Sequence, residues 1–142
     1  MDQNPRERLA RIRELAGVRA YEFQGFIIVC GKTARDNEVL SLKFAAQGDH
    51  WFHARGVAGS HVLILRAAGR LPNRDVINAA AALTIYFSKY RGGGLCPVSY
   101  CDGSAVNRVR GAATGTVAIR GERVVKVRPL APENIPGLEP VD

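Results

Sequence analysis

Apolar residues recur along the chain at two different spacings, and these spacings predict both helices and strands. Near the N-terminus, Leu9, Ile12 and Leu15 follow Asn4-Pro5 at helical spacing. An asparagine followed by proline is typical of a helix start, because the side chain caps the first turn and proline fits the first helical position. A short amphipathic helix is therefore expected there.

A longer helix is predicted for residues 73–90. Apolar residues recur there at steps of three and four from Val76 to Tyr90, and a run of four alanines would allow close packing on a sheet. Another short helix is expected after Thr33, because Thr33 and Asp36 have the spacing of a capping box.

The remaining apolar segments are typical of strands. Residues 51–55 alternate between the two faces of a sheet, whereas residues 61–67 form a nearly continuous apolar run that indicates a central strand. A hairpin is expected to turn at Gln24-Gly25. The expected strands cover residues 21–23, 26–30, 51–55, 61–67, 98–101, 106–110, 115–119 and 123–128.

These elements predict one domain of the α+β class, with a mainly antiparallel sheet packed by one long and one or two shorter helices. A length of 142 residues suffices for such a core. We expect an N-terminal helix within residues 1–20, the body of the domain over residues 21–130, and a flexible, proline-containing tail over residues 131–142.

Two features favour the cytoplasm as the location of the protein. No apolar run is long enough to span a bilayer, and the N-terminus has no secretory core. Three cysteines, an odd number, are too few for a disulfide scaffold, so buried or incidental thiols are expected.

Charge adds the first indication of function. Twenty basic residues outweigh thirteen acidic ones, giving +7, and sixteen of the bases are arginine. Arginine pairs bidentately with phosphate and stacks on bases, so the balance favours a nucleic acid over a membrane, for which an apolar amphipathic helix would also be needed. The alternative is that the arginines reflect genome composition or solubility.

A first candidate site lies where a strand is expected to lead into a helix. Lys32, Arg35 and Asn37 are placed there to bind a phosphate with the help of free backbone N–H groups. The alternative is that Asp36 and Glu38 pair with these bases on a solvated face.

A second candidate site lies on the alternating strand. Trp51, His53 and Arg55 share one face and would form a base-stacking and phosphate-binding strip if that face were exposed. The alternative is that Trp51 is a core residue and His53 a satisfied buried histidine. Ser60 and His61, at a turn into the next strand, would then still offer an anion site. We expect Lys32, Arg35, His53, Arg55 and His61 to converge on one basic face.

The C-terminal part of the body is the most basic region. Arg108 and Arg110 are expected on one strand face, and Lys126 and Arg128 on another, in rows suited to phosphate contacts. A protective charged edge strand is the alternative. The basic residues of this region, residues 91–128, are Arg91, Arg108, Arg110, Arg120, Arg123, Lys126 and Arg128.

Catalysis, a metal site and a cofactor are not expected. His50 and His53 point to opposite faces of a strand, and no Cys-x-x-Cys pair accompanies them. Nothing like Gly-x-Ser-x-Gly surrounds Ser60, and the Gly-Lys-Thr at residues 31–33 lacks the upstream glycine of a phosphate-binding loop.

Several separated segments, in order, resemble the NFACT-R family, also called domain of unknown function 814. They are Gly-Lys-Thr-Ala-Arg-Asp-Asn at residues 31–37, Asp-His-Trp-Phe-His-Ala-Arg at 49–55, Gly-Ser-His-Val at 59–62, Pro-Val-Ser-Tyr at 97–100 and Val-Asn-Arg-Val-Arg-Gly-Ala at 106–112. The resemblance covers about residues 21–127. Around residues 111–115 the family commonly has prolines, whereas this chain has glycines.

The resemblance implies an RNA-binding domain. In this family the domain usually forms the C-terminal part of larger ribosome quality-control factors, which bind the large ribosomal subunit and tRNA. Free-standing bacterial versions are linked to tRNA processing or modification. We therefore expect this chain to recognise structured RNA, tRNA or large-subunit ribosomal RNA, through basic and aromatic residues, with the ribosome or a tRNA-modifying enzyme as a further partner. The alternative is a protein-docking module for such an enzyme or for a ribosome-associated partner.

Overall fold

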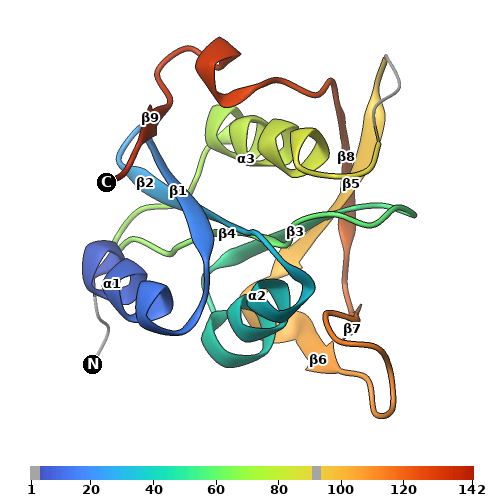
Figure 1. The fold of residues 1–142 in the computed structure, drawn as a ribbon. Helices are drawn as coiled ribbons and strands as arrows, with labels where there is room; N and C mark the ends of the chain where they lie inside the picture. Colours follow the sequence, from blue (N-terminus) through green and yellow to red (C-terminus); the bar gives the residue numbers. More distant parts are fainter. Residues whose placement is uncertain (1–3, 91–93) are drawn as a thin grey trace.

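The computed structural model describes residues 4–90 and 94–142 and has an α+β fold, as the apolar pattern predicted. Seven strands form one antiparallel sheet in the order β8-β5-β3-β4-β2-β1-β9, with helices on both faces (Figure 1). The helices are α1 (Pro5–Leu15), α2 (Ala34–Val39), the π-helical turn η1 (Leu40–Phe44), α3 (Arg74–Tyr86) and the 3₁₀ turns η2 (Gly103–Ala105) and η3 (Pro132–Asn134). The strands of the main sheet are β1 (Val18–Phe23), β2 (Phe26–Gly31), β3 (His50–Ala54), β4 (Val62–Ile64), β5 (Cys96–Asp102), β8 (Arg123–Val127) and β9 (Glu139–Pro140), and a separate hairpin contains β6 (Val106–Arg108) and β7 (Val117–Ile119).

The helix starts follow the predicted caps. The Asn4 side chain accepts a hydrogen bond from the backbone N–H of Glu7 at 2.8 Å, and Thr33 and Asp36 form a reciprocal capping box. The predicted hairpin is also confirmed, because Gln24 (φ 49°) and Gly25 (φ 83°) make the left-handed turn that joins β1 to β2.

Helix α3 ends at Tyr86, earlier than predicted, because the next residues pair with a loop instead. The backbone N–H of Lys89 donates to the carbonyl of Ala58 at 2.8 Å, and Ser88 forms a bridge with Gly59. Three glycines at residues 92–94 are typical of a helix end, but α3 ends before them, and Arg91, Gly92 and Gly93 lie outside the described residues.

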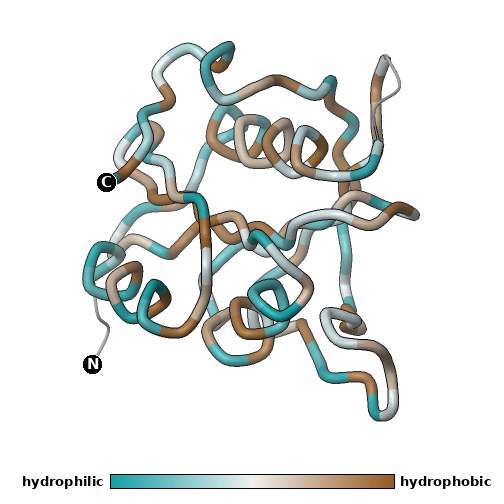
Figure 2. Tube along the Cα trace, viewed as in Figure 1, coloured by the Kyte–Doolittle hydropathy of each residue, from teal (hydrophilic) through white to brown (hydrophobic). Residues whose placement is uncertain are grey.

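One face of the sheet is covered by α3, as predicted. The alanines of α3 and the strand residues beneath it, Phe52, Val62 and Ile64 among them, belong to one buried cluster. Because alanine has almost no side chain, the helix axis lies close to the strands. Hydrophobic residues accordingly concentrate along the central strands (Figure 2).

The other face is covered by α1, α2 and η1, which pack on the β2 side of the sheet. Leu9, Ile12, Leu40 and Trp51 meet in a second buried cluster there. Helix α1 is also fixed by Arg8, whose guanidinium pairs with the buried carboxylate of Asp49. The N-terminal helix is therefore part of the core.

Coverage of this second face stops before the far strands. His53, Ser99 and Val124 form one cross-strand row on this side of β3, β5 and β8. Pro97 and Lys126 form the next row, and Arg55, just after β3, joins it because its backbone N–H donates to the Pro97 carbonyl at 3.0 Å. Val124 is 41% exposed and Lys126 is exposed. The β6–β7 hairpin lies beside this part of the sheet and leaves a cavity between the hairpin and α2.

Residues 131–142 differ from the expected flexible tail. Strand β9 pairs with β1, Ile135 is buried against the α3 side, and the Arg13 guanidinium donates to the carbonyls of Val141 and Asp142 at 2.6 and 3.0 Å. Proline-rich composition predicted a free segment, but these contacts join it to the sheet. Among residues 4–90 and 94–142, no helix is long and apolar enough to cross a membrane.

Candidate functional site

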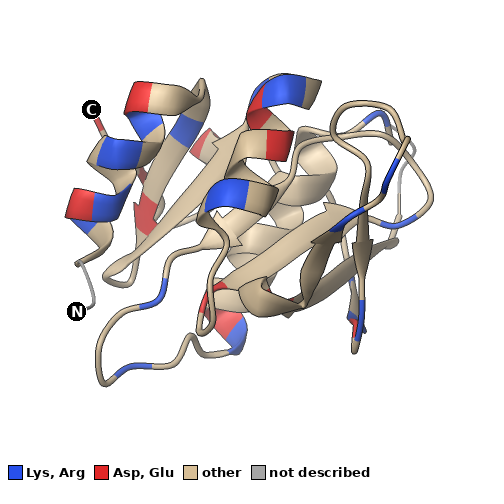
Figure 3. Ribbon diagram, turned by 90° about the horizontal axis from the view of Figure 1, so that it is seen from below, with Lys and Arg blue, Asp and Glu red and all other residues tan. Residues whose placement is uncertain are grey.

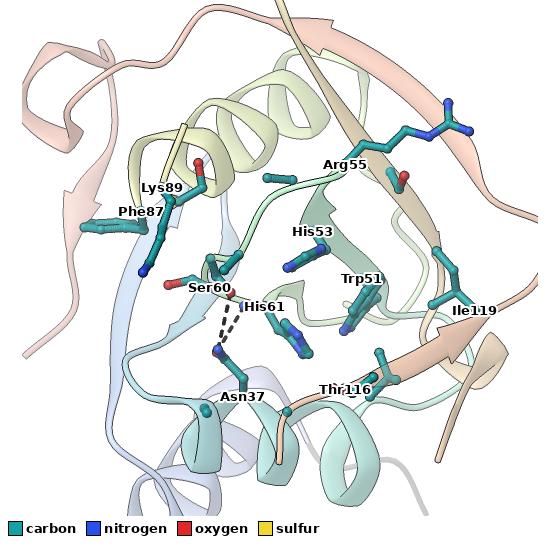
Figure 4. A pocket seen from close by; sticks show the side chains of 18 of the residues that line it. Asn37, Trp51, His53, Arg55, Ser60, His61, Phe87, Lys89, Thr116 and Ile119 are labelled. Carbon is teal, nitrogen blue, oxygen red and sulfur yellow. Dashed lines mark hydrogen bonds between the residues drawn. The ribbon is translucent and has the colours of Figure 1, made fainter. Parts of the chain in front are cut away.

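A cavity of about 760 Å³ lies on the incompletely covered face (Figure 4). Five separate parts of the chain line it. They are Lys32 to Ala34 with Asn37 at the start of α2, residues between 51 and 61 from β3 into the turn before β4, residues 87–89 after α3, Ser99 of β5, and the β6–β7 hairpin with Glu122. A volume of this size is typical of small-molecule and cofactor sites, which bury most of what they bind.

Three aromatic rings form the floor of the cavity. The rings of Trp51 and His53 are stacked with centroids 6.0 Å apart, and His61 meets both of them edge-on at 5.2 and 5.1 Å. In the described part of the chain neither ring nitrogen of His53 has a hydrogen-bond partner, and this half-buried ring lines the cavity. The floor therefore offers the ring of His53, backed by Trp51 and His61, with its two nitrogens free for a ligand.

A buried serine holds two of these rings. Ser41 Oγ accepts a hydrogen bond from Trp51 Nε1 at 2.8 Å and lies 2.6 Å from His61 Nδ1. We assign the serine proton to this second bond, so that His61 carries its own proton on Nε2. Ser41 reaches both rings from the π-helical turn η1. In this turn the Ala45 N–H donates to the carbonyl of Leu40, five residues earlier.

The turn that leads into β4 is fixed by side chains from two neighbouring segments. Asn37 Oδ1 accepts from the backbone N–H of His61 at 3.0 Å, and Ser60 Oγ donates to the Gly31 carbonyl at 2.6 Å. Gly31 must be glycine here, because a Cβ would lie 2.1 Å from Asn37 Oδ1. These contacts set the position of His61 before any ligand arrives.

Burial keeps both histidines of the floor neutral. Burial, with a smaller contribution from nearby His53, lowers the pKa of His61 to about 3. Burial also lowers the pKa of His53 below its ordinary value of 6.5. Near neutral pH the floor is therefore uncharged. His53 presents one donor and one acceptor nitrogen, whereas His61 has its Nδ1 bonded to Ser41 and keeps only the Nε2–H.

The rim of the cavity is cationic. Lys32, Arg55 and Lys89 are exposed around it, and Glu122 is the single acidic residue among the described lining residues. Arg19 stands 4.5 Å above the ring of Phe87, another lining residue. Basic residues lie mainly on helices and loops, whereas the central strands carry little charge (Figure 3). The positive charge thus surrounds the neutral floor.

Most of the site residues expected from the sequence line this cavity: Lys32, Asn37, Trp51, His53, Arg55, Ser60 and His61. Arg35, Arg108 and Arg110 are not among its lining residues. Arg108 instead lies with Glu38 and Lys43 at a shallow depression on another side of α2. Four of the five residues expected to converge, all except Arg35, therefore share the cavity.

Three details differ from the expectations. Trp51 is only 2% exposed, so the exposed stacking strip is wrong at this residue and the alternative of a core tryptophan is confirmed. Strand β6 ends at Arg108 and Arg110 lies in the following turn, so the two arginines do not share a strand face. At the start of α2, the Asp36 carboxylate accepts from the Thr33 N–H, and Thr33 Oγ1 accepts from the Asp36 N–H, so these two amides are not free for a phosphate.

Sequence reasoning missed Lys89, Ser41 and the hairpin residues Thr114 and Thr116. Lys89 and the hairpin reach the cavity only through tertiary pairing, and no local signal indicates that. In the described residues no three histidine, cysteine or acidic side chains gather as a metal site would need. The three cysteines are buried, and burial raises the pKa of Cys30 to about 12.

Known proteins resemble this chain in sequence and in fold. Residues 18–121 match the family model described as the NFACT protein RNA binding domain. Proteins named Rqc2 homolog RqcH are 36% identical over 103 residues in Streptococcus suis (72% of this chain, 18% of the relative) and 36% identical over 107 residues in Bacillus subtilis (75% and 18%). The chain thus spans less than a fifth of the length of these relatives.

A solved structure, that of the C-terminal part of the fibronectin/fibrinogen-binding protein from Streptococcus suis, has the same fold. It superposes with a TM-score of 0.73 and is 30% identical, covering 98% of this chain and 50% of the solved chain. The likeness extends beyond the family match to nearly the whole of this chain.

Proposed function

Because the chain belongs to the family of NFACT protein RNA-binding domains, we propose that it binds structured RNA through the face that carries the cavity. The observation that carries this proposal is the continuity of positive charge on that face. The rim bases Lys32, Arg55 and Lys89 surround the cavity. Lys126 extends the charge along the sheet, because it pairs with Pro97, whose carbonyl accepts from the Arg55 N–H. A phosphate backbone needs such spaced cationic contacts.

The RNA that we propose is tRNA or ribosomal RNA of the large subunit. The relatives named Rqc2 homolog RqcH support a role in ribosome quality control, and processing or modification of tRNA is the second setting. The preorganised cavity favours a folded RNA with a fixed shape, because a rigid site gains most from a ligand that is already ordered. We propose binding without catalysis by this chain, in the cytoplasm.

A protein-docking function is the alternative, and one feature favours it. Strand β8 is an edge strand of the main sheet, so its outer edge is unpaired within the described residues. Its residue Val124 is exposed. A partner strand could pair with such an edge. In this case the basic face would serve solubility.

Salt titration of RNA binding separates the two functions. The test variant carries Lys32→Ala with Arg55→Ala, and its control carries Arg6→Ala with Arg74→Ala, which removes the same charge from exposed positions outside the cavity lining. We expect the test variant to bind a folded tRNA at least about tenfold more weakly. The plot of log affinity against log salt should flatten by about one and a half units, since each phosphate contact releases roughly 0.7 to 0.9 ions.

The control should retain nearly the affinity and salt slope of the original protein. Equal losses of affinity in both variants would mean that only the net charge of the protein matters. The cavity face would then not be the RNA-binding surface. If the original protein does not bind folded RNA at low salt, the docking function replaces RNA binding.

A further inference from the structure

We propose that the cavity accepts one unpaired nucleotide of the bound RNA, with its base on the ring floor and its phosphates at the cationic rim. This inference rests on the proposed function and names the part of the RNA that the site selects. It follows from the division of the cavity into a neutral aromatic floor and a charged rim, which matches the two halves of a nucleotide.

The floor suits a base better than a phosphate. His53 is half-buried, lines the cavity and has both ring nitrogens free of partners in the described residues. A neutral imidazole has one donor and one acceptor, as base edges do, whereas a phosphate presents acceptors alone. The pKa of His53, lowered by burial, keeps the ring in this neutral form.

The walls add polar groups of the same kind. Thr114 and Thr116 from the β6–β7 hairpin line the cavity, and a threonine hydroxyl can both donate and accept a hydrogen bond. Gly115 fixes the hairpin over α2, because its backbone N–H donates to Glu38 Oε2 at 3.1 Å. A base on the floor would therefore have hydroxyl groups within the same enclosure.

The rim is suited to the rest of the nucleotide. Lys32, Lys89 and Arg55 come from three different segments around the opening, and all three side chains are exposed. Phosphates of an extruded nucleotide stay in the backbone of the RNA, at the level of the rim. Paired bases cannot reach the floor, because a duplex shows only their edges, whereas an unpaired base can leave the stack.

The site is built before the ligand binds. Ser41 bonds to both Trp51 and His61, and Asn37 holds the backbone of His61, so the ring floor needs little ordering on binding. Preorganisation of this kind lowers the entropic cost of recognition. Ser41, which is 2% exposed and does not line the cavity, is accordingly a positioning residue.

The test compares RNA hairpins that share one stem and differ by a single bulged nucleotide, with the full chain and fluorescence anisotropy as the readout. We expect at least about fivefold tighter binding to the bulged hairpin, which corresponds to the lower end of stacking energies per base. With 2-aminopurine as the bulged base, binding should change its fluorescence, since that signal reports base stacking.

His53→Ala should reduce the preference for the bulged hairpin to about one, while binding of the paired hairpin and its salt slope remain. His50→Ala is the matched control, because it removes a histidine from the same strand, β3, but from a position that does not line the cavity. Ser41→Ala should weaken the preference without abolishing it. Thermal melts of each variant report folding, and the 2-aminopurine signal of the original protein does not depend on any variant.

The outcomes separate this inference from the proposed function. Equal binding of both hairpins, with no change in 2-aminopurine fluorescence, overturns the inference and leaves RNA binding intact. Absence of binding to either hairpin at low salt contradicts the proposed function itself. If a polyglutamate peptide displaces the bulged hairpin as well as unlabelled RNA does, the cavity belongs to an acidic protein segment and the inference is wrong.

Discussion

Arg8 and Asp49 form a bidentate ion pair inside the domain, with Nη1–Oδ1 and Nη2–Oδ2 distances of 2.6 and 2.8 Å. Asp49 is fully buried and also accepts hydrogen bonds from the backbone N–H groups of Ala46 and Arg66. Arg8 further donates to the Phe44 carbonyl at 2.9 Å. One carboxylate thus joins α1, the loop after η1 and the segment after β4.

Replacing Arg8 by Met should lower the free energy of unfolding by about 3–5 kcal/mol, because the Asp49 carboxylate would stay buried without its counter-charge. Urea denaturation measures this loss. The control is Arg6→Ala in the same helix, which breaks an exposed pair with Glu22 and should cost no more than about 1 kcal/mol. Similar losses in the two variants would contradict a structural role for the buried pair.

Stability should fall as the solution is acidified below neutral pH. The folded-state pKa of His61 is about 3, compared with an ordinary value of 6.5. Between these two pH values the histidine is protonated in the unfolded chain and neutral in the folded one. The stability that neutral His61 contributes is fully present above about pH 6.5 and is lost as the pH falls toward 3. By pH 5 the free energy of unfolding should be about 2 kcal/mol lower. His53, whose pKa is also lowered, acts in the same direction.

Urea denaturation at pH 7 and pH 5 tests this dependence. Asp36 and Asp102 also have lowered pKa values in the folded state, but their ordinary value of 3.8 places their effect at more acidic pH. His61→Gln should therefore be less stable at pH 7 and lose less stability between the two pH values. An unchanged pH dependence in this variant would assign the titration to another group.

Gly31→Ala should damage both stability and the cavity. A Cβ would stand 2.1 Å from Asn37 Oδ1, so the bond from Asn37 to the His61 N–H must break or shift. We expect a loss of about 1–3 kcal/mol, the cost of an unsatisfied buried group, together with weaker binding of bulged RNA. Calorimetry and the hairpin assay measure the two effects.

The control for this substitution is Gly121→Ala. Gly121 has a left-handed φ of 64° but nothing within 4 Å of an added Cβ, so it reports backbone strain alone. It should cost about 1 kcal/mol and leave the preference for bulged RNA unchanged. If both variants lose that preference, the effect of Gly31→Ala is not specific to the cavity.

Replacing Arg108 and Arg110 together by Ala should weaken binding of folded RNA almost equally for all sequences. Both side chains are exposed and neither lines the cavity, so their contacts are expected to be with phosphates. The salt slope should flatten by about one to two units, and stability should change by no more than about 0.5 kcal/mol. A salt titration with bulged and paired hairpins checks this, and selective loss of the bulged hairpin would contradict it.

Local signals predicted most of the fold. The caps at Asn4 and Thr33 and the Gln24-Gly25 turn act within a few residues, so the sequence alone indicates them. The alternation over β3 likewise separated Trp51 and His53 from Phe52. It could not say that both faces are buried, since that depends on helices elsewhere in the chain.

The rest depended on contacts between distant residues. Arg8 meets Asp49 across 41 positions, and β9 pairs with β1 at the other end of the chain, although prolines in its vicinity indicated a free segment. Lys89 reaches the cavity because residues 87–89 pair with the 58–60 loop. No periodicity or propensity carries information about such pairings.

Helix α3 covers one face of the sheet completely, whereas the other face is partly open. Successive residues of one strand therefore serve either the core or the cavity. In β3 and β5 the residues under α3 and the residues beside the cavity alternate, so Phe52 and Val98 maintain the core while His53 and Ser99 meet what enters from outside. A substitution at a cavity position leaves its two neighbours in the α3 core undisturbed. Substitutions at these cavity positions can therefore change what the domain binds without changing the core that keeps it folded.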